Sequence, residues 1–175
     1  DVGGYSLNYH KHIHTGEGGV IVTNDDKIFE KLQLIRNHAE AVVEGKGVTD
    51  LTNMVGHNFR LGEIECAIGI EQLKKMQTFV TKRQAIAIQL NEGLKNLEGL
   101  SIPIVKSDCT HAYYIYGISL NLNKIKVTRD RLIQALEAEG VDGLIGGYVN
   151  VHMLPMYQQK IAYGSKGFPW NSDIC

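Results

Sequence analysis

The sequence predicts a protein of the mixed α/β class, and three observations support this prediction. Two strand-like segments, residues 2–7 and 19–23, flank a stretch that contains Lys11 and a glycine-rich turn. Residues 63–97 place apolar side chains at helical spacing. From Leu100 the pattern changes to short strands with one amphipathic helix.

Length, composition and charge are those of an ordinary globular protein. The chain has 175 residues, of which 43% are hydrophobic and 21% charged, and this length permits one domain with a sizeable core. The net charge of -1 gives no basic surface for nucleic acid or an anionic membrane, and no apolar run is long enough to span a bilayer. Three cysteines without metal-type spacing predict a reducing, cytoplasmic compartment.

The first strand, residues 2–7, ends just before Lys11. Partial desolvation of an amine beside a strand end and a glycine-rich turn frees it to act as a nucleophile or a base. Ser6 lies five residues upstream and provides a hydroxyl, and the turn provides backbone N–H groups. The second strand, residues 19–23, is apolar and closes at Asn24.

Residues 25–38 are predicted to form a helix, with apolar side chains at helical spacing and a cap at residues 24–26. Residues 39–55 contain two glycines and mixed polarity, and they predict a loop. From Glu63 two apolar stripes follow, which predict two packed helices or one bent helix that ends near Gly99.

The last part of the chain predicts strand, strand, helix and strand in this order. Residues 101–105 and 112–121 are the first two strands, and the second is rich in tyrosine and isoleucine. Residues 128–139 form an amphipathic helix that Gly140 ends, and residues 141–151 form the third strand.

Two segments resemble one known family. Residues 6–19 read SLNYHKHIHTGEGG, and residues 55–69 read VGHNFRLGEIECAIG. The first is similar to S-F-x-x-x-K-x-I-x-T-G-E-G-G and the second to G-x-N-x-R-x-x-E-I-x-A-A-I-G. Both patterns are typical of the DegT/DnrJ/EryC1/StrS family of pyridoxal-phosphate (PLP) aminotransferases, which act on nucleotide sugars. Residues 152–157 and 167–169 are similar to further segments of that family.

The resemblance implies the fold: the C-terminal half of a type I PLP aminotransferase, cut at both ends. Residues 1–97 then correspond to the end of the large α/β domain with its linking helices. Residues 98–175 correspond to the small α+β domain. Because the family's ring-stacking aromatic residue and its aspartate partner for the pyridine nitrogen precede this region, we expect the chain to be inactive alone.

The resemblance also implies the chemistry and the site. Lys11 would bind PLP covalently and move the proton, while Ser6 would bind the phosphate. Asn58 would reach the phosphate of a partner subunit, which implies a homodimer. Arg60 and His152 are weaker candidates for binding substrate. The reaction would transfer an amino group, from glutamate, to a keto sugar linked to a nucleotide, as in polysaccharide biosynthesis.

Three alternatives stay open. A related branch of the family dehydrates sugars at carbon 3 and has histidine at the lysine position; Lys11 therefore favours transamination. A non-catalytic or regulatory member of the same fold would bind PLP without turnover. His10, His12 and His14 alternate and can face one side of a strand, which suits a divalent metal, but no acidic or cysteine ligand lies close in sequence. We therefore expect no metal.

Overall fold

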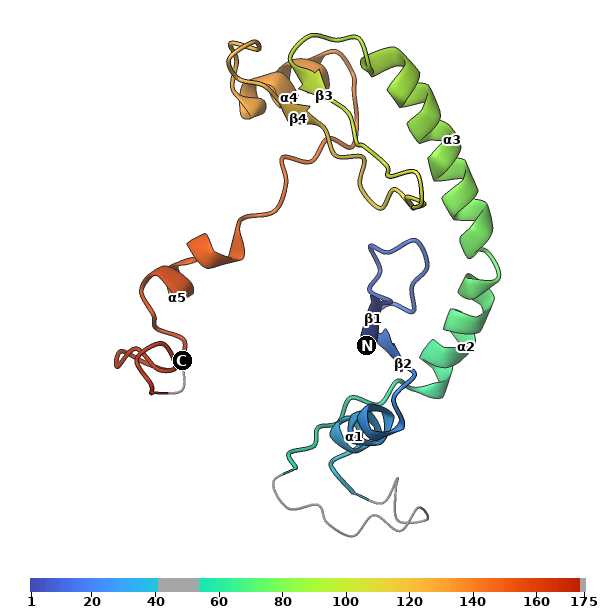
Figure 1. The fold of residues 1–175 in the computed structure, drawn as a ribbon, viewed down its shortest axis with the longest axis vertical. Coiled ribbons are helices and arrows are strands. Elements are labelled where there is room, and N and C mark those ends of the chain that lie inside the picture. Colours follow the sequence, from blue (N-terminus) through green and yellow to red (C-terminus); the bar gives the residue numbers. More distant parts are fainter. Residues whose placement is uncertain (41–53, 174–175) are drawn as a thin grey trace. The chain divides into compact units, whose positions relative to one another are not determined.

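The computed structural model describes residues 1–40 and 54–173. The chain forms two compact units, residues 1–119 and residues 120–175, and each is described by itself. The first unit begins with β1 (Val2–Ser6) and β2 (Gly19–Thr23), which form an antiparallel two-stranded sheet (Figure 1). Val2 pairs with Thr23 and Ser6 with Gly19, so both predicted strands are confirmed.

Helix α1 (Asp26–Arg36) follows β2 directly and confirms the predicted helix. Its N-cap is Asp25, whose carboxylate accepts hydrogen bonds from the backbone N–H groups of Lys27 at 2.9 Å and Ile28 at 3.1 Å. Leu34 on this helix is buried. The cap satisfies two of the four N–H groups that every helix start leaves unpaired.

The loop predicted for residues 39–55 lies largely outside the described residues, since 41–53 are not described. Beyond it the chain returns to the end of α1. The backbone N–H of His57 donates to the Ile35 carbonyl at 2.7 Å, and that of Phe59 donates to the Arg36 carbonyl at 3.0 Å. These bonds surround an isolated antiparallel bridge between Asn37 and Asn58.

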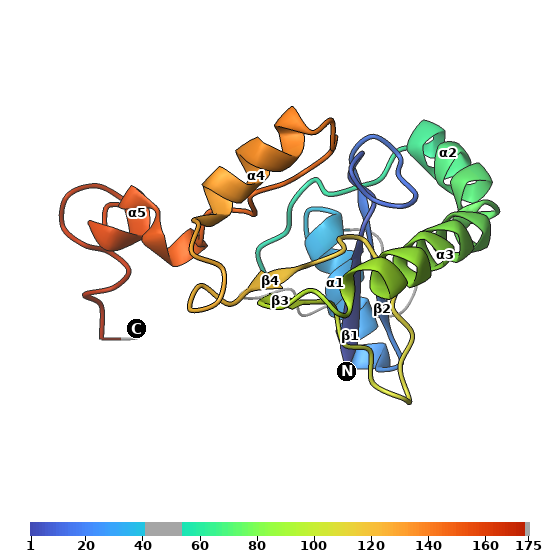
Figure 2. The ribbon, with the colours of Figure 1, turned by 90° about the horizontal axis from the view of Figure 1, so that it is seen from above.

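Two helices follow, α2 (Glu63–Leu73) and α3 (Met76–Leu94). They are separated by Lys74 and Lys75 and run end to end, as Figures 1 and 2 show. Two helices were one of the two arrangements that the sequence predicts, although they follow each other and do not lie side by side. No helix among the described residues is both long and apolar enough to cross a membrane.

The two strands predicted for residues 101–105 and 112–121 are wrong over most of their length. The structure has only the short β3 (Leu100–Ser101) and β4 (Ser119–Leu120) within these described segments, and they pair with each other. Residues 111–116 bond to side chains instead of a neighbouring strand: Gln84 of α3 donates to the His111 carbonyl at 3.1 Å, and Arg83 to the Tyr113 carbonyl at 3.0 Å.

These contacts also explain where the first unit ends. Residues 111–116 pack along α3, so the unit extends to Ser119, beyond the domain boundary predicted after residue 97. A compact unit shows only which residues of this chain pack together, and it does not test where the domains of the family fold divide. The predicted division at residue 97 therefore stays a prediction.

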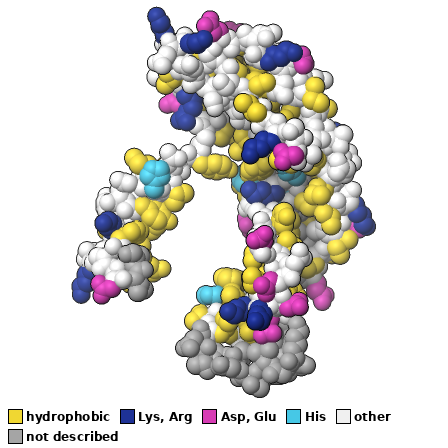
Figure 3. All heavy atoms as spheres, in the orientation of Figure 1, with side chains coloured by type: hydrophobic (Ala, Val, Ile, Leu, Met, Phe, Trp, Pro, Cys, Tyr) yellow, Lys and Arg dark blue, Asp and Glu magenta, His cyan; other side chains and the backbone are white. Residues whose placement is uncertain are grey.

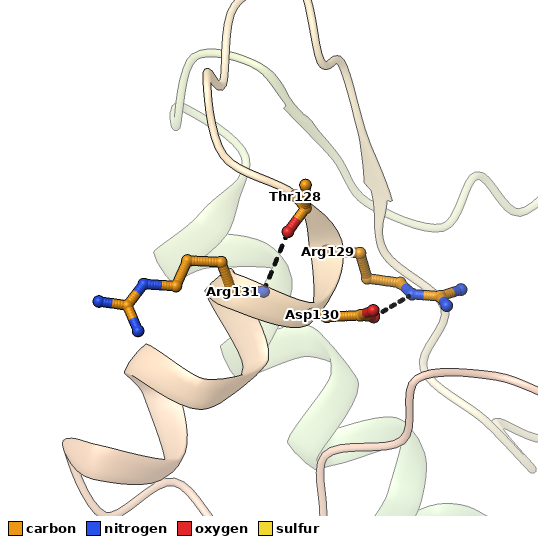
Figure 4. A network of polar contacts seen from close by, with 4 residues as sticks. All are labelled: Thr128, Arg129, Asp130 and Arg131. Carbon is orange, nitrogen blue, oxygen red and sulfur yellow. Dashed lines mark hydrogen bonds and ion pairs between the residues drawn. The ribbon is translucent and has the colours of Figure 1, made fainter.

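The second unit contains α4 (Arg129–Ala138), the 3₁₀ helix η2 (Val151–Met153) and α5 (Pro155–Gln158). Figure 4 shows the start of α4, where the Thr128 hydroxyl accepts the backbone N–H of Arg131 at 3.3 Å and Arg129 approaches Asp130. This confirms the predicted helix. The strand predicted for residues 141–151 is wrong, because Gly143 and Gly147 adopt positive φ angles that interrupt an extended backbone.

Few side chains are buried. Among the described residues the buried ones are Leu34, Ala39, Ala87 and Thr15. Large apolar side chains remain on the surface, such as Ile64 and Ile104, and Figure 3 shows hydrophobic atoms spread over the visible face. The sizeable core that the chain length permits is therefore not formed by the described residues.

Candidate functional site

Lys11 lies in the loop that joins β1 to β2, residues 7–18. The base of this loop is closed by two backbone hydrogen bonds, from Leu7 to the Gly18 carbonyl at 2.9 Å and from Thr15 to the Leu7 carbonyl at 3.0 Å. The Asn8 side-chain amide donates to the Glu17 carboxylate at 2.7 Å across the loop. The Lys11 N–H donates to the Asn8 carbonyl at 2.9 Å. The lysine is thus presented by a loop with several internal bonds.

The glycine-rich turn after Lys11 shapes this loop around Thr15. Thr15 is only 5% exposed, and its hydroxyl donates to the Glu17 carbonyl at 2.8 Å. Gly16 and Gly18 have φ angles of 86° and 152°, in the region that favours glycine. The Gly-Glu-Gly-Gly sequence therefore has a structural task, as its turn-forming composition predicts.

The Lys11 side chain reaches residues 111–116. Its amine Nζ lies 4.3 Å from the centroid of the Tyr114 ring. The neighbouring His12 donates from Nε2 to the Ala112 carbonyl at 2.9 Å. Two adjacent residues of the Lys11 loop therefore contact the same segment, which is distant in sequence.

A cavity of about 600 Å³ lies between the Lys11 loop and α3, within the first unit. Its lining combines three cations, Lys11, Lys82 and Arg83, with aromatic and aliphatic side chains. The other lining residues are His12, Phe79, Ile86, Ala87, Leu90, Tyr113 and Tyr116. None of these lining residues has a carboxylate, so the cavity suits an anionic molecule that has an apolar ring.

Tyr116 lies at the cavity wall and is fixed by α3. Its hydroxyl donates to the Asn91 side-chain carbonyl at 2.6 Å. Burial, and to a smaller extent the neighbouring Tyr113, raises the pKa of Tyr116 above its ordinary value. The Tyr116 hydroxyl is therefore a neutral hydrogen-bond donor over the physiological pH range.

Of the other predicted site residues, Ser6 ends β1 and lies five residues before Lys11. Its hydroxyl oxygen accepts the backbone N–H of Asn8 at 3.2 Å, which leaves its own proton available to a phosphate oxygen. Asn58 has an exposed side chain, and its backbone takes part in the bridge to Asn37. Neither residue lines the cavity beside Lys11.

Arg60 takes part in a second, smaller depression. It donates to the Asn37 side-chain carbonyl at 2.6 Å, and it lines a hollow of about 430 Å³ together with Glu17, Gly18 and Gly19. The structure thus brings the second family-like segment against the glycine-rich turn. It does not place Arg60 in the cavity beside Lys11.

His152 belongs to the second unit, in η2, where its carbonyl accepts a hydrogen bond from the Gln158 side chain at 2.6 Å.

The three alternating histidines do not form a metal site with acidic or cysteine ligands: within residues 1–40 and 54–173 no group of three or more such side chains gathers. The His10 ring contacts the Tyr9 ring at a tilt of 35°, and His12 is hydrogen-bonded to the Ala112 carbonyl.

The sequence reasoning missed Tyr113, Tyr114 and Tyr116 as site residues. It interpreted residues 112–121 as a strand, and tyrosine is common in strands. A signal was present, since three tyrosines within four positions follow His111. Several aromatic rings with hydroxyl groups in one short segment also suit the lining of a ligand-binding cavity.

The donor set fits PLP. PLP needs a primary amine for its aldehyde, which Lys11 Nζ offers at the cavity edge, and the cationic groups of Lys82 and Arg83 in the same lining suit a phosphate. Ser6 and Asn58 carry a hydroxyl and an amide of the kind that binds phosphate, but they lie outside this lining. The aromatic and aliphatic cavity lining suits the apolar face of a pyridine ring.

Comparison with known proteins gives a consistent result. The model of the DegT/DnrJ/EryC1/StrS aminotransferase family matches residues 1–175. The UDP-4-amino-4,6-dideoxy-N-acetyl-beta-L-altrosamine transaminase of Helicobacter pylori is 30% identical, over 91% of this chain and 42% of its own length. The H. pylori aminotransferase PseC, involved in the biosynthesis of pseudoaminic acid, superposes with a TM-score of 0.71 at 28% identity, over 90% of this chain and 42% of that one.

A second similar structure holds the cofactor. The E. coli GDP-4-keto-6-deoxy-D-mannose-3-dehydratase with bound hydrated PLP has a TM-score of 0.67 at 27% identity, over 81% of this chain and 39% of that one. The chain spans less than half the length of the curated relatives it matches. The predicted fold class, part of an α/β aminotransferase of a PLP-using family, is confirmed.

Proposed function

This chain belongs to the DegT/DnrJ/EryC1/StrS aminotransferase family, and from that premise we propose that it is part of an enzyme that transfers an amino group from glutamate to a nucleotide-linked keto sugar. One observation of the structure supports this most: the amine of Lys11 lies at the edge of a cavity that is rich in cations and aromatic rings. Such a cavity suits PLP and a sugar nucleotide, which are both anionic.

Lys11 has two tasks in this proposal. Its Nζ would bind the aldehyde of PLP covalently, and, when free, it removes the proton from the carbon that loses the amino group and delivers a proton to the carbon that gains it. PLP supplies an electron sink for that carbon when it is bound. The loop bonds between Asn8 and Glu17 and between Thr15 and Glu17 support Lys11 by limiting the motion of its backbone.

Ser6 and Asn58 are proposed to bind the phosphate of PLP, Ser6 within the same chain and Asn58 from a partner chain. The exposed position of Asn58 supports a contact in trans, since its side chain is accessible to a second subunit. Arg60 and His152 are proposed to contact the substrate. The enzyme would therefore act as a homodimer. We also propose a cytoplasmic location, which the free, exposed Cys66 and Cys109 thiols support.

Reductive trapping tests the role of Lys11. The purified chain is incubated with PLP, treated with borohydride and mapped by peptide mass spectrometry. We expect the label on Lys11, its loss in Lys11→Arg, and its retention in Lys82→Arg, which removes the amine of another lysine at the same cavity. An equal label on exposed lysines throughout the chain, or an unchanged label in Lys11→Arg, contradicts the proposal.

A mixing experiment tests the contact in trans. If Asn58 serves the partner's site, a dimer of one Lys11→Arg chain and one Asn58→Ala chain has one site with both residues intact. Mixing the two variants then restores PLP retention that neither shows alone. If Asn58 serves its own chain, or no dimer forms, mixing restores nothing.

We further propose that the chain does not turn over by itself. So few described side chains are buried that the cavity wall is held by a small number of contacts, which gives poor preorganisation of the site. The test is transfer of ¹⁵N from labelled glutamate to a nucleotide-linked 4-keto sugar, followed by mass spectrometry. Robust transfer by the isolated chain contradicts this part of the proposal.

Dehydration is the second candidate function, since a sugar 3-dehydratase is among the similar structures. Lys11 argues against it, because a lysine amine can bind PLP covalently and a histidine cannot. The same ¹⁵N assay separates the two functions in a longer protein that contains this chain. Amination adds ¹⁵N to the sugar, whereas dehydration removes a hydroxyl and leaves the sugar without ¹⁵N.

A further inference from the structure

The amine of Lys11 is held against an aromatic face. Its Nζ lies 4.3 Å from the centroid of the Tyr114 ring, well within the range of about 6 Å over which a cation is attracted by a ring face. The described residues that line the adjoining cavity provide no carboxylate. The Glu17 carboxylate in the same loop accepts a hydrogen bond from Asn8. The ring face of Tyr114 therefore lies beside the Lys11 amine, in the place where a carboxylate counter-ion would be expected.

The position of the Tyr114 ring is itself fixed from several sides. Its neighbours are bonded to α3, through Gln84 to the His111 carbonyl and through Arg83 to the Tyr113 carbonyl. The His12 ring meets the Tyr114 ring edge-on, with centroids 6.1 Å apart. The ring thus belongs to a segment that is bonded to a helix, whereas Lys11 lies on a loop.

We propose that Tyr114 is a positioning residue for Lys11, whose ring face holds the ammonium group at the cavity whenever the amine is not joined to another molecule. This role rests on the proposed function of Lys11, because it matters for turnover only if Lys11 alternates between a bound and a free amine. Tyr114 keeps the free amine beside the place where it must react again. By keeping the free Lys11 amine close to the place where it reacts, Tyr114 favours the reaction through proximity. This role needs no proton transfer by Tyr114.

Nuclear magnetic resonance of the chain without PLP tests the contact directly. Lysines are reductively methylated with ¹³C-formaldehyde, which preserves their charge, and Lys11 is assigned with Lys11→Arg. We expect the Lys11 methyl signal to be shifted upfield by the Tyr114 ring current and to show a nuclear Overhauser effect to the ring protons. A Lys11 signal at the position of exposed lysines, without that effect, overturns the proposal.

Variants separate the ring from its hydroxyl. Tyr114→Phe keeps the ring face and should keep the upfield shift, whereas Tyr114→Leu should lose it. Acetylation of Lys11 by acetic anhydride should then rise roughly two- to five-fold in Tyr114→Leu, which is the size of an exposed cation–π contact. Tyr163→Leu, at an exposed tyrosine of the second unit, is the matched control and should change neither readout.

If Tyr114→Leu does not fold, the nuclear Overhauser effect in the unaltered chain and the shift in Tyr114→Phe still decide the question. The outcomes also separate this inference from the proposed function. A ring-shifted Lys11 that is not labelled by PLP and borohydride contradicts the function of Lys11, and with it the positioning role in turnover. A labelled Lys11 without a ring shift contradicts the role of Tyr114 alone.

Discussion

Gly18 and Thr15 lie so close that no side chain fits between them: a Cβ atom on Gly18 would be 2.8 Å from the Thr15 hydroxyl oxygen. The same Cβ would lie 2.9 Å from a methyl group of Leu61. The Lys11 loop is therefore closed by a contact that requires glycine at position 18. The close approach of Leu61 to Gly18 links the glycine-rich turn to the segment that leads into α2.

Replacement of Gly18 by alanine is expected to destabilise the chain by about 1–3 kcal/mol, because the positive φ and the steric overlap both oppose a Cβ. Urea unfolding, followed by circular dichroism, measures this. Gly93→Ala in α3 is the matched control: its Cβ meets no atom within 4 Å, so it should stabilise the chain by about 0.5–1 kcal/mol. Equal effects of the two changes would show that the Gly18 contact is absent in solution.

Gly56→Ala is expected to be more severe. A Cβ there would lie 2.0 Å from the backbone nitrogen of Ala39, and backbone cannot move aside as a flexible side chain can. We expect a loss of about 3 kcal/mol, at the upper end of overpacking costs. Gly117→Ala, with nothing within 4 Å, serves as the comparison in the same unfolding assay. Near-identical stability of the two variants would contradict the close return of the chain onto α1.

The N-cap of α1 offers a milder test. Asp25→Ala removes the acceptor for two backbone N–H groups and should reduce the free energy of unfolding by about 1 kcal/mol. Asp25→Asn keeps an oxygen acceptor and should recover most of that loss. If asparagine and alanine are equally destabilising, the cap bonds are not what stabilises this end of the helix.

The raised pKa of Tyr116 predicts that the free energy of unfolding depends on pH above neutrality. Because its pKa is raised in the fold, its neutral hydroxyl stabilises the folded chain fully below the pKa of an unfolded tyrosine. That contribution is lost as the pH rises through the higher pKa of the folded state. Tyr116→Phe, which removes the bond to Asn91, should cost about 0.5–1.5 kcal/mol at neutral pH.

The measurement for Tyr116 is urea unfolding of the unaltered chain and Tyr116→Phe between pH 8 and roughly pH 11, a range chosen to span ordinary tyrosine ionisation. The stability difference should shrink towards alkaline pH. Tyr163→Phe, at an exposed tyrosine, should differ little from the unaltered chain throughout. A Tyr116→Phe difference that is constant over this range would contradict the raised pKa.

Local patterns in the sequence correctly predicted the elements that depend on local chemistry. Apolar residues at positions 20–22 predicted β2, the capping residues 24–26 predicted the start of α1, and Thr128 predicted that of α4. The glycine-rich turn and the lysine before it were also found in sequence, since turn geometry and capping depend on neighbouring residues. The family followed from the same two segments.

The structure places the predicted site residues in different parts of the chain, and their roles stay predictions. Lys11 lies at a cavity, but Arg60 lies in a different hollow and His152 in the other unit. The spacing of residues along a chain does not determine which distant segments meet. No pattern around Lys11 points to residues 111–116, because about a hundred positions separate them, as in the bond from His12 to Ala112.

The sequence by itself determined the family, the two strands and the capped helices, and the lysine beside a glycine-rich turn. These depend on backbone preferences and on contacts between near neighbours. The tertiary structure alone decided that the tyrosine-rich segment is not a strand and that its ring at position 114 meets the amine of Lys11. The physical reason is that polar side chains of α3 bind the carbonyl groups of this segment, which a strand would otherwise have offered to a neighbouring strand.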